Sequence, residues 1–231
     1  MVMKISVVIP ALNEGHQIEH CLESLRCQRF RDFEVIVVDN GSTDDTERVA
    51  RRYGCRVIHE VRQGVSYARQ RGFEAAHGEL IASTDADTIL PPNWLELIAR
   101  SFEERPDQVG VYGRILLWER EGLSQWLAEF LFSAFLRLNH LLGVPHFCGP
   151  NFAVRREAFL QVGGFKDEDG RFYQVSEDLQ LSLKLARWGY IRFHKDLVAY
   201  TSPRRLAQDS LRYMWAHTKN YWSIAWLRRA R

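Results

Sequence analysis

Two acidic residues, Asp85 and Asp87, stand one residue apart in the stretch LIASTDADTILPP, directly after an apolar run that predicts a buried strand. Side chains two positions apart on an extended chain point the same way, so the two carboxylates would repel each other unless a positive charge lies between them. Carboxylate oxygens are the ligands that Mg²⁺ and Mn²⁺ prefer in proteins. The spacing therefore predicts a divalent-cation site. The alternative, a helix N-cap ahead of Pro91 and Pro92, would need only one such side chain.

The segments around this pair predict the sheet that must position it. Apolar runs alternate with helical patterns, and this alternation is typical of βαβ units on a parallel sheet. In an open α/β sheet the ligand crevice lies at the carboxyl ends of the strands, so we expect the loops PALNEG, DNGSTDDT and TDADT to meet in one cleft. The predicted strands span 5–9, 35–38, 56–58 and 80–83, and the predicted helices span 15–28, 43–53, 65–76 and 93–104.

The stretch DNGSTDDT has a structural explanation as well as a functional one. Ser42 or Thr43 is expected to cap the second helix, with Asp44 and Asp45 in its first turn, where acids suit the helix dipole. Asp39 stands before this helix, so capping does not explain it. A turn built on Asp-Asn-Gly is the structural alternative for Asp39.

The second half of the chain is less regular. A strand is predicted at 109–118 and a helix at 123–143. Glu129, Arg137 and His140 make this helix a poor membrane span, so a core or interface helix is favoured over a lipid-facing one. We expect one domain, with an N-terminal nucleotide half at 1–105, a C-terminal acceptor half at 106–205 and a C-terminal helix at 206–231. The apolar stripe of the helix at 123–143 comprises Leu127, Phe130, Leu131, Ala134, Phe135, Leu138 and Leu142.

Charge is spread unevenly along the chain. The net charge is only +2, but the stretch from Leu179 to Arg231 holds 11 Lys and Arg against 2 Asp and Glu. Its end, RRLAQDSLRYMWAHTKNYWSIAWLRRAR, predicts an amphipathic helix that lies either on anionic lipid or on the protein core. Because its basic residues form no nucleic-acid-binding module, no nucleic-acid partner is expected.

The beginning of the chain predicts no secretory signal. Its apolar run is interrupted at Pro10 and Asn13, and no small-residue cleavage site follows. We therefore expect the protein in the cytoplasm or at the cytoplasmic face of the membrane. The hydrophobic content of 46% excludes a disordered chain.

Six motifs in order resemble the family 2 inverting glycosyltransferases with the GT-A fold. The resemblance implies a Rossmann-like, mostly parallel sheet flanked by helices, with a C-terminal acceptor-binding half. Gln70 departs from it, because the family more often has Asn at this place. The motifs are VVIPALNE (7–14), VVDNGSTDDT (37–46), GVSYARQRGFEAAHGE (64–79), TDADT (84–88), GPNFAVRREAFLQVGGF (149–165) and SED (176–178).

The resemblance implies a role for particular residues. Asp87 would bind Mg²⁺ or Mn²⁺ with Asp85, and Asp178 would act as the general base with Glu177 beside it. A helix N-terminus that favours acids is the alternative for this second pair, and an ordinary exposed Arg is the alternative for Arg69. The implied nucleotide site comprises Pro10, Ala11, Glu14, Asp39, Gly41, Ser42, Arg69 and Asp85, and the implied acceptor side comprises Gly149, Asn151, Gly163 and Gly164.

The implied activity is transfer of a single sugar from a nucleotide-diphosphate sugar, with UDP favoured, to a hydroxyl group. The acceptor would be a lipid-linked or cell-envelope glycan precursor, with peripheral membrane contact through the C-terminal helix. Two other functions are kept as alternatives. One is a non-catalytic scaffold that binds sugar nucleotides, and the other is a phosphatase of the DxDxT type, in which the first Asp is the nucleophile.

Overall fold

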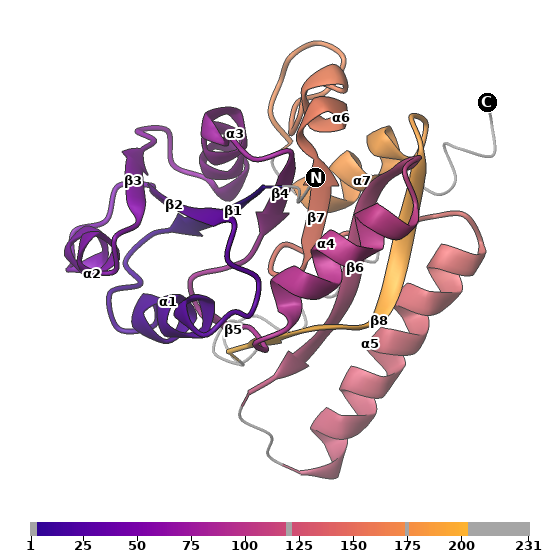
Figure 1. Cartoon of the computed structure of the whole chain (residues 1–231), viewed down its shortest axis with the longest axis horizontal. Coiled ribbons are helices and arrows are strands. Elements are labelled where there is room, and N and C mark those ends of the chain that lie inside the picture. Colours follow the sequence, from indigo (N-terminus) through magenta and orange to yellow (C-terminus); the bar gives the residue numbers. More distant parts are fainter. Residues whose placement is uncertain (1–3, 119–121, 174–175, 203–231) are drawn as a thin grey trace.

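The N-terminal half follows the predicted alternation of strands and helices (Figure 1). The structure is a computed structural model that describes residues 4–118, 122–173 and 176–202, so the helix predicted at 206–231 lies outside the described residues. The strands are β1 (Ile5–Ala11), β2 (Phe33–Asp39), β3 (Arg56–His59) and β4 (Leu80–Ser83), and the helices are α1 (Ile18–Arg26), α2 (Thr46–Arg52), α3 (Val65–Ala75) and α4 (Trp94–Glu104).

The remaining described elements extend the same sheet. They are β5 (Thr88–Ile89), β6 (Gln108–Leu117), α5 (Leu123–Leu141), β7 (Phe152–Arg155), α6 (Arg156–Gln161), α7 (Glu177–Leu185) and β8 (Tyr190–Thr201). The strand order within the described residues is β3-β2-β1-β4-β7-β6-β8-β5. Strands β1 to β4 pair in parallel, as do β6 and β8, whereas β7 is antiparallel to both neighbours and β5 to β8. The predicted α/β class with a mostly parallel sheet is confirmed.

Helices cover both faces of this sheet, and this explains the continuous apolar runs in the sequence. Successive strand residues point to opposite faces. Val7 and Ile9 of β1 pack in one buried cluster, whereas Val8 packs in the other. A strand buried on both faces has no polar alternation. Helices α1, α2 and α4 contribute to the first cluster, and α3, α5, α6 and α7 contribute to the second.

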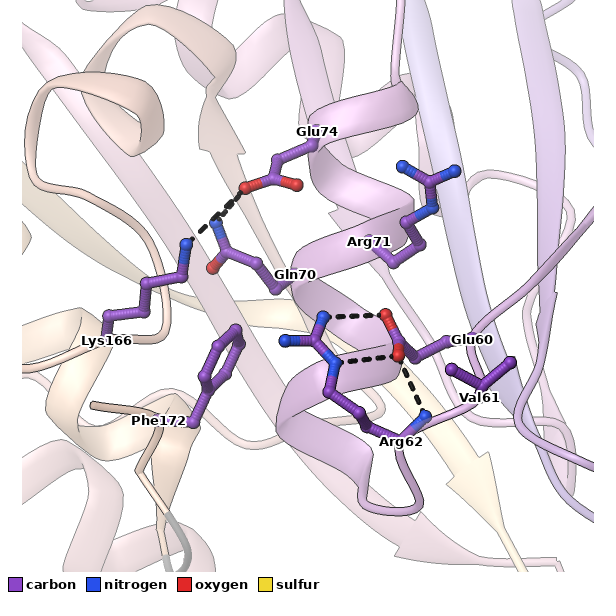
Figure 2. A pocket seen from close by; sticks show the side chains of 8 residues that line it. All are labelled: Glu60, Val61, Arg62, Gln70, Arg71, Glu74, Lys166 and Phe172. Carbon is purple, nitrogen blue, oxygen red and sulfur yellow. Dashed lines mark hydrogen bonds and ion pairs between the residues drawn. The ribbon is translucent and has the colours of Figure 1, made fainter. Parts of the chain in front are cut away.

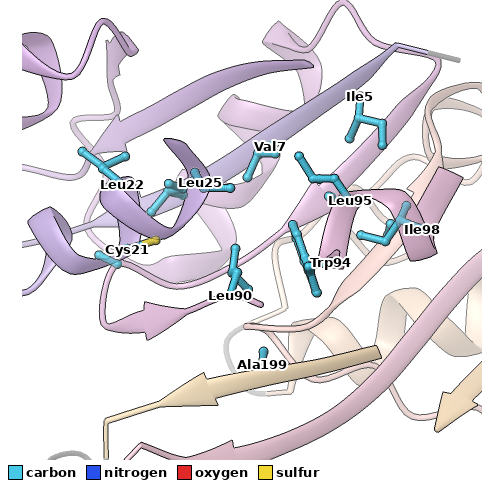
Figure 3. Packing of buried hydrophobic residues seen from close by; sticks show 14 of the residues in the cluster. Ile5, Val7, Cys21, Leu22, Leu25, Leu90, Trp94, Leu95, Ile98 and Ala199 are labelled. Atoms are coloured by element: carbon cyan, nitrogen blue, oxygen red, sulfur yellow. The ribbon is translucent and has the colours of Figure 1, made fainter. Parts of the chain in front are cut away.

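The first cluster joins the two halves of the chain. Figure 3 shows Ile5, Trp94 and Ile98 of the N-terminal half in the same cluster as Ala199 of β8. Trp94 is fully buried, and its indole Nε1 donates a hydrogen bond of 2.8 Å to Oδ1 of Asn151. The sheet and its core are therefore continuous across both predicted halves.

The side of helix α5 that is buried is not the side that the apolar stripe predicts. Five residues of the predicted apolar stripe, Leu127, Phe130, Leu131, Leu138 and Leu142, are exposed. The helix instead turns its more polar side inward, where Glu129, Leu136 and Asn139 are buried. The core interpretation is therefore wrong for this stripe, and the interface interpretation stays a prediction. Like the other described helices, α5 is not both long enough and apolar enough to cross a bilayer.

Candidate active site

The loops after β1 and β2 are tied together by side chains. Asp39 and Ala11 are register partners at the ends of their parallel strands. The Asn13 amide donates to Ser42 Oγ at 3.0 Å, and Asn13 Oδ1 accepts from the Thr43 amide at 2.8 Å. Glu14 is buried next to them. Ser42 thus holds this junction, and the expectation that it caps α2 is wrong, since that helix begins at Thr46.

Asp39 has a defined orientation at the carboxyl end of β2. Its side chain is 7% exposed, with Oδ1 accepting from the Ser42 amide at 3.1 Å and Oδ2 lying 3.3 Å from His59 Nδ1. Gly41 between them has φ +92°, a conformation that favours glycine. The turn-forming interpretation of Asp39 is therefore confirmed, and binding of a nucleotide base stays a prediction.

The other ring nitrogen of His59 lies 3.6 Å from Glu47 Oε1. Asp39, Glu47 and His59 form a group that has enough donors for a metal ion. Each imidazole nitrogen, however, faces a different carboxylate, so the ring lies between Asp39 and Glu47. The pair at 85 and 87 is not part of this group.

Asp85 and Asp87 do not lie on an extended chain. The backbone turns between them, and the Thr88 amide donates to the Asp85 carbonyl at 3.2 Å. Asp85 Oδ1 accepts from Arg69 Nη2 at 2.7 Å, whereas Asp87 is buried and its Oδ1 accepts from Thr201 Oγ1 at 3.4 Å. The premise that both carboxylates point to one spot because of an extended chain is therefore wrong. Binding of a cation to them stays a prediction.

Arg69 connects the loop after β4 to the second acidic pair. Its side chain is only 4% exposed, and its guanidinium binds Asp85 through Nη2 and Glu177 through Nη1. Burial opposes its charge, but the carboxylates of Asp85, Glu177 and Asp178 outweigh burial and raise the pKa of Arg69 above its usual value. The alternative of an ordinary exposed Arg is wrong.

Asp178 lies beside this ion pair at the start of α7. Its Oδ2 accepts from the Gly149 amide and its Oδ1 accepts from the Leu179 amide, both at 2.8 Å. Burial raises the pKa of the Asp178 and Glu177 carboxyls, and Arg69 acts in the opposite direction. Both acids are in the first turn of α7, so the helix N-terminus also favours their charge.

Glycine is required at position 149. A Cβ atom built on Gly149 would overlap the guanidinium of Arg69. The loop can therefore approach Asp178 with its amide only because the side chain is absent. This gives Gly149 a positioning contact with the proposed base, while a contact with an acceptor stays a prediction.

The other predicted acceptor-side residues have contacts within the protein. Asn151 is fully buried, and its Nδ2 donates to the carbonyls of Arg114 and Leu197 at 2.7 and 3.0 Å. Its amide joins β6, β8 and α4, and its role in lining the acceptor site stays a prediction. Gly163 and Gly164 form a left-handed turn after α6, with φ +72° and +63°.

The amide side chains of Asn40 and Gln70 position loops around the site, and the sequence did not predict this role. Asn40 Nδ2 donates to the carbonyls of Glu60 and Arg62 at 2.8 Å, which fixes the loop ahead of α3. Gln70 Oε1 accepts from the Phe165 amide at 2.8 Å, so its extra methylene reaches across to the C-terminal half. The departure at Gln70 was visible in the sequence, but its contact partner lies far along the chain.

A cavity of about 310 Å³ lies between α3 and the loop after α6 (Figure 2). Four of its charged side chains form two pairs, since Arg62 binds Glu60 at 2.9 Å and Lys166 lies 3.9 Å from Glu74. None of the residues predicted for the donor or catalytic site lines it. This cavity is distinct from the arrangement around Arg69.

The buried Arg69 joins Asp85 of one acidic pair to Glu177 of the other beside an α/β sheet. Residues 6–163 match the model of Glycosyl transferase family 2, so the chain belongs to that family and is a glycosyltransferase. The resemblance drawn from the six motifs is confirmed, and the phosphatase alternative is wrong. The SED motif (176–178) lies beyond the residues that match the family model. The interpretation of Asp178 as the general base therefore depends on the contacts of its carboxylate.

Relatives and solved structures agree with this family. A glucosyl-dolichyl phosphate glucuronosyltransferase of Haloferax volcanii is 28% identical over 188 residues, which are 73% of this chain and 58% of the relative. The chain thus spans little more than half the length of that relative. An uncharacterised glycosyltransferase of Mycobacterium tuberculosis is 29% identical over 224 residues, covering 95% of this chain and 97% of its own.

The similar solved structures have the GT-A fold, which is the fold of this chain. A mannosyltransferase of Pyrobaculum calidifontis, in complex with GDP-Man and Mn²⁺, has a TM-score of 0.70 at 24% identity over 87% of this chain and 57% of its own. Glucosyl-3-phosphoglycerate synthase of Mycobacterium tuberculosis, in complex with Mn²⁺, UDP and glucosyl-3-phosphoglycerate, has a TM-score of 0.64 at 27% identity over 89% of this chain and 74% of its own.

Proposed function

We propose that this chain transfers one sugar from a nucleotide-diphosphate sugar to an acceptor hydroxyl with inversion at the anomeric carbon, using a divalent cation and Asp178 as general base. The observation that carries the proposal is the set of contacts around the buried Arg69. Its guanidinium binds Asp85, in the loop expected at the donor, and Glu177. Asp178, the neighbour of Glu177, accepts from the Gly149 amide.

The donor atoms near this set suit Mg²⁺ or Mn²⁺. Asp87 and Asp85 offer carboxylate oxygens at the carboxyl end of β4, and a cation that binds phosphates needs only one or two protein carboxylates. When bound, such an ion neutralises the charge of the diphosphate leaving group. The UDP and Mn²⁺ in the complex of the Mycobacterium tuberculosis synthase support UDP as the favoured nucleotide.

Asp178 would accept the proton of the acceptor hydroxyl as its oxygen forms the new bond to the anomeric carbon. The bond from that carbon to the diphosphate oxygen breaks at the same time, and no covalent sugar intermediate forms. Backbone amides of Gly149 and Leu179 hold the carboxylate in place for this step. Burial, which raises the pKa of Asp178, makes it a stronger base than an exposed aspartate.

Glu177 has a different place in this proposal. Its carboxylate is committed to Arg69, so it would position the site and would not take the proton. The acceptor is proposed to be a lipid-linked or cell-envelope glycan precursor, and transfer would take place at the cytoplasmic face of a membrane. The dolichyl phosphate in the name of the Haloferax volcanii relative supports a lipid-linked acceptor.

The test is a panel of UDP-, GDP- and dTDP-sugars, each with and without Mn²⁺, read by thermal unfolding and by release of the free nucleotide diphosphate. A ligand at 100 times its dissociation constant stabilises the folded state by about 2.7 kcal/mol. We expect stabilisation by UDP-sugars that requires the cation, together with slow release of UDP. Stabilisation without release or transfer would indicate the scaffold alternative, and no stabilisation by any member would contradict the proposed donor site.

A further inference from the structure

Side chains of the loop after β2 bind successive backbone amides of the loop after β1. The Glu14 amide donates to Thr46 Oγ1 and the Gly15 amide donates to Asp44 Oδ2, both at 2.9 Å. The preceding amide, that of Asn13, is bound by the same loop. A Cβ atom built on Gly15 would lie only 3.0 Å from Asp44 Oδ2, so this close approach is suited to glycine. The stretch GSTDDT therefore binds its neighbouring loop, which helix capping does not explain.

The two carboxylate oxygens of Asp44 accept from three donors. Oδ1 accepts from the Thr46 amide at 3.0 Å and from the Thr46 hydroxyl, and Oδ2 accepts from the Gly15 amide. Because the Thr46 hydroxyl donates to Asp44, its oxygen is left to accept from the Glu14 amide. Burial opposes the charge of this carboxylate, but the hydrogen bonds from Thr46 and Gly15 outweigh burial and lower the pKa of Asp44. An asparagine here would leave a donor unpaired, since its amide nitrogen accepts nothing.

The backbone of Glu14 is bound on both sides. Its amide donates to Thr46, and its carbonyl accepts from the Gln17 and Ile18 amides at 2.9 and 2.8 Å, where α1 begins. The residue before it, Asn13, has φ +55°, a left-handed conformation that is uncommon outside glycine. Strain of this kind persists only where the surrounding contacts hold it. The contacts between the two loops therefore determine the direction in which the Glu14 side chain leaves the chain.

We propose that Asp44 and Thr46 are positioning residues of the donor site, which direct Glu14 so that its carboxylate accepts from the ribose hydroxyls of the nucleotide. This rests on the proposed function, in which Glu14 belongs to the nucleotide site. Both loops follow the carboxyl ends of parallel strands, where the ligand crevice of an open α/β sheet lies and where acids bind ribose hydroxyls. A carboxylate that is held in place before the nucleotide arrives loses less conformational freedom on binding.

The test is calorimetric binding of UDP and of 2′-deoxy-UDP with Mn²⁺ present throughout, and of GDP and its 2′-deoxy form in parallel. The wild type should bind the ribose form about tenfold or more tightly, since the deoxy form leaves a carboxylate oxygen without its donor. Asp44→Asn and Thr46→Val should weaken binding of the ribose form and bring the ratio of the two dissociation constants close to one. Thr46→Ser keeps the hydroxyl and should keep the wild-type ratio.

The matched control is Asp45→Asn, one residue further along the same stretch. Asp45 is exposed, and its carboxylate pairs with Arg48 of α2 at 2.6 Å. No hydrogen bond joins its side chain to the loop after β1 within the described residues, so this variant should bind both forms of the nucleotide like the wild type. Thermal unfolding verifies that each variant is folded.

A wild-type ratio in Asp44→Asn would overturn the inference even if both affinities fall, because a general loss of structure weakens the two forms of the nucleotide alike. A wild type that binds UDP or GDP without discriminating against the 2′-deoxy form would overturn the ribose contact and leave the donor site in place. Failure of the wild type to bind any of these nucleotides would contradict the proposed function, and this inference with it.

Discussion

The pKa of the Asp178 carboxyl is subject to opposing effects. Burial raises the pKa of its carboxyl, while Arg69 and the amides of Leu179 and Gly149 favour the ionised form. A general base needs both properties, since it must be ionised to accept a proton and basic enough to retain it. Sugar transfer should therefore decline as the pH falls through the pKa of this carboxyl, because the protonated form cannot accept the acceptor's proton.

Asp178→Asn should lower the turnover number by roughly 10²–10⁴, the usual range for loss of a general base, while donor binding stays close to that of the wild type. Turnover measured at saturating donor, with donor affinity from thermal unfolding, separates these effects. The control is Glu168→Gln, because Glu168 is an exposed acid in the same half of the chain. Wild-type turnover in Asp178→Asn would assign the base elsewhere, with Glu177 first to be examined.

At the scale of the elements, Arg69 joins α3 to the β4 loop and to α7. Its partners are 16 and 108 residues away in the sequence. A buried guanidinium with two carboxylates is sensitive to the loss of one member, because an unpaired buried charge remains. The planar fork of Arg binds both acids at once, and Lys has no equivalent geometry.

Arg69→Gln should destabilise the folded state by about 3–5 kcal/mol, measured by urea unfolding. Adding Glu177→Gln should recover part of this loss, since one uncompensated carboxylate is removed. The control is Arg26→Gln on α1, whose partner Glu23 is also exposed, and it should change stability little. Strict additivity of the two changes at Arg69 and Glu177 would contradict a direct coupling between these side chains.

At the scale of the whole molecule, one sheet and two apolar clusters, one on each of its faces, run through both predicted halves. Strand β4 of the first half pairs with β7 of the second, and Ala199 of β8 packs in the cluster that contains Ile5. We expect the described part of the chain to unfold in one cooperative step, because each of the two clusters contains residues of both halves.

Ile98→Ala should lower the free energy of unfolding by about 2–5 kcal/mol and move the whole transition, because Ile98 is fully buried in the shared cluster. Urea unfolding is followed by circular dichroism and by tryptophan fluorescence. The control Val61→Ala, at a side chain that is 91% exposed, should stay within about 0.5 kcal/mol of the wild type. Separate transitions, with only one displaced, would indicate two independent units.

The sequence by itself determined the strands and helices of the N-terminal half and the chemistry of their loops. Apolar runs such as 80–83 identify strands buried on both faces, and their ends place Asp39 and Asp85 at the same edge of the sheet. These features depend on local patterns of apolar and polar residues. A single sequence carries such local patterns, which is why the position of these loops follows from it.

Only the tertiary structure decided which polar groups meet and which way α5 faces. The pairing of Arg69 with Glu177 and the burial of Asn151 depend on contacts between residues far apart in the chain. The stripe on α5 is apolar whether it faces a core or the outside, so its pattern does not specify a direction. Glu129 specifies the direction of α5, because a buried carboxylate needs a hydrogen-bond donor and the Leu117 amide supplies it on the inner side of the helix.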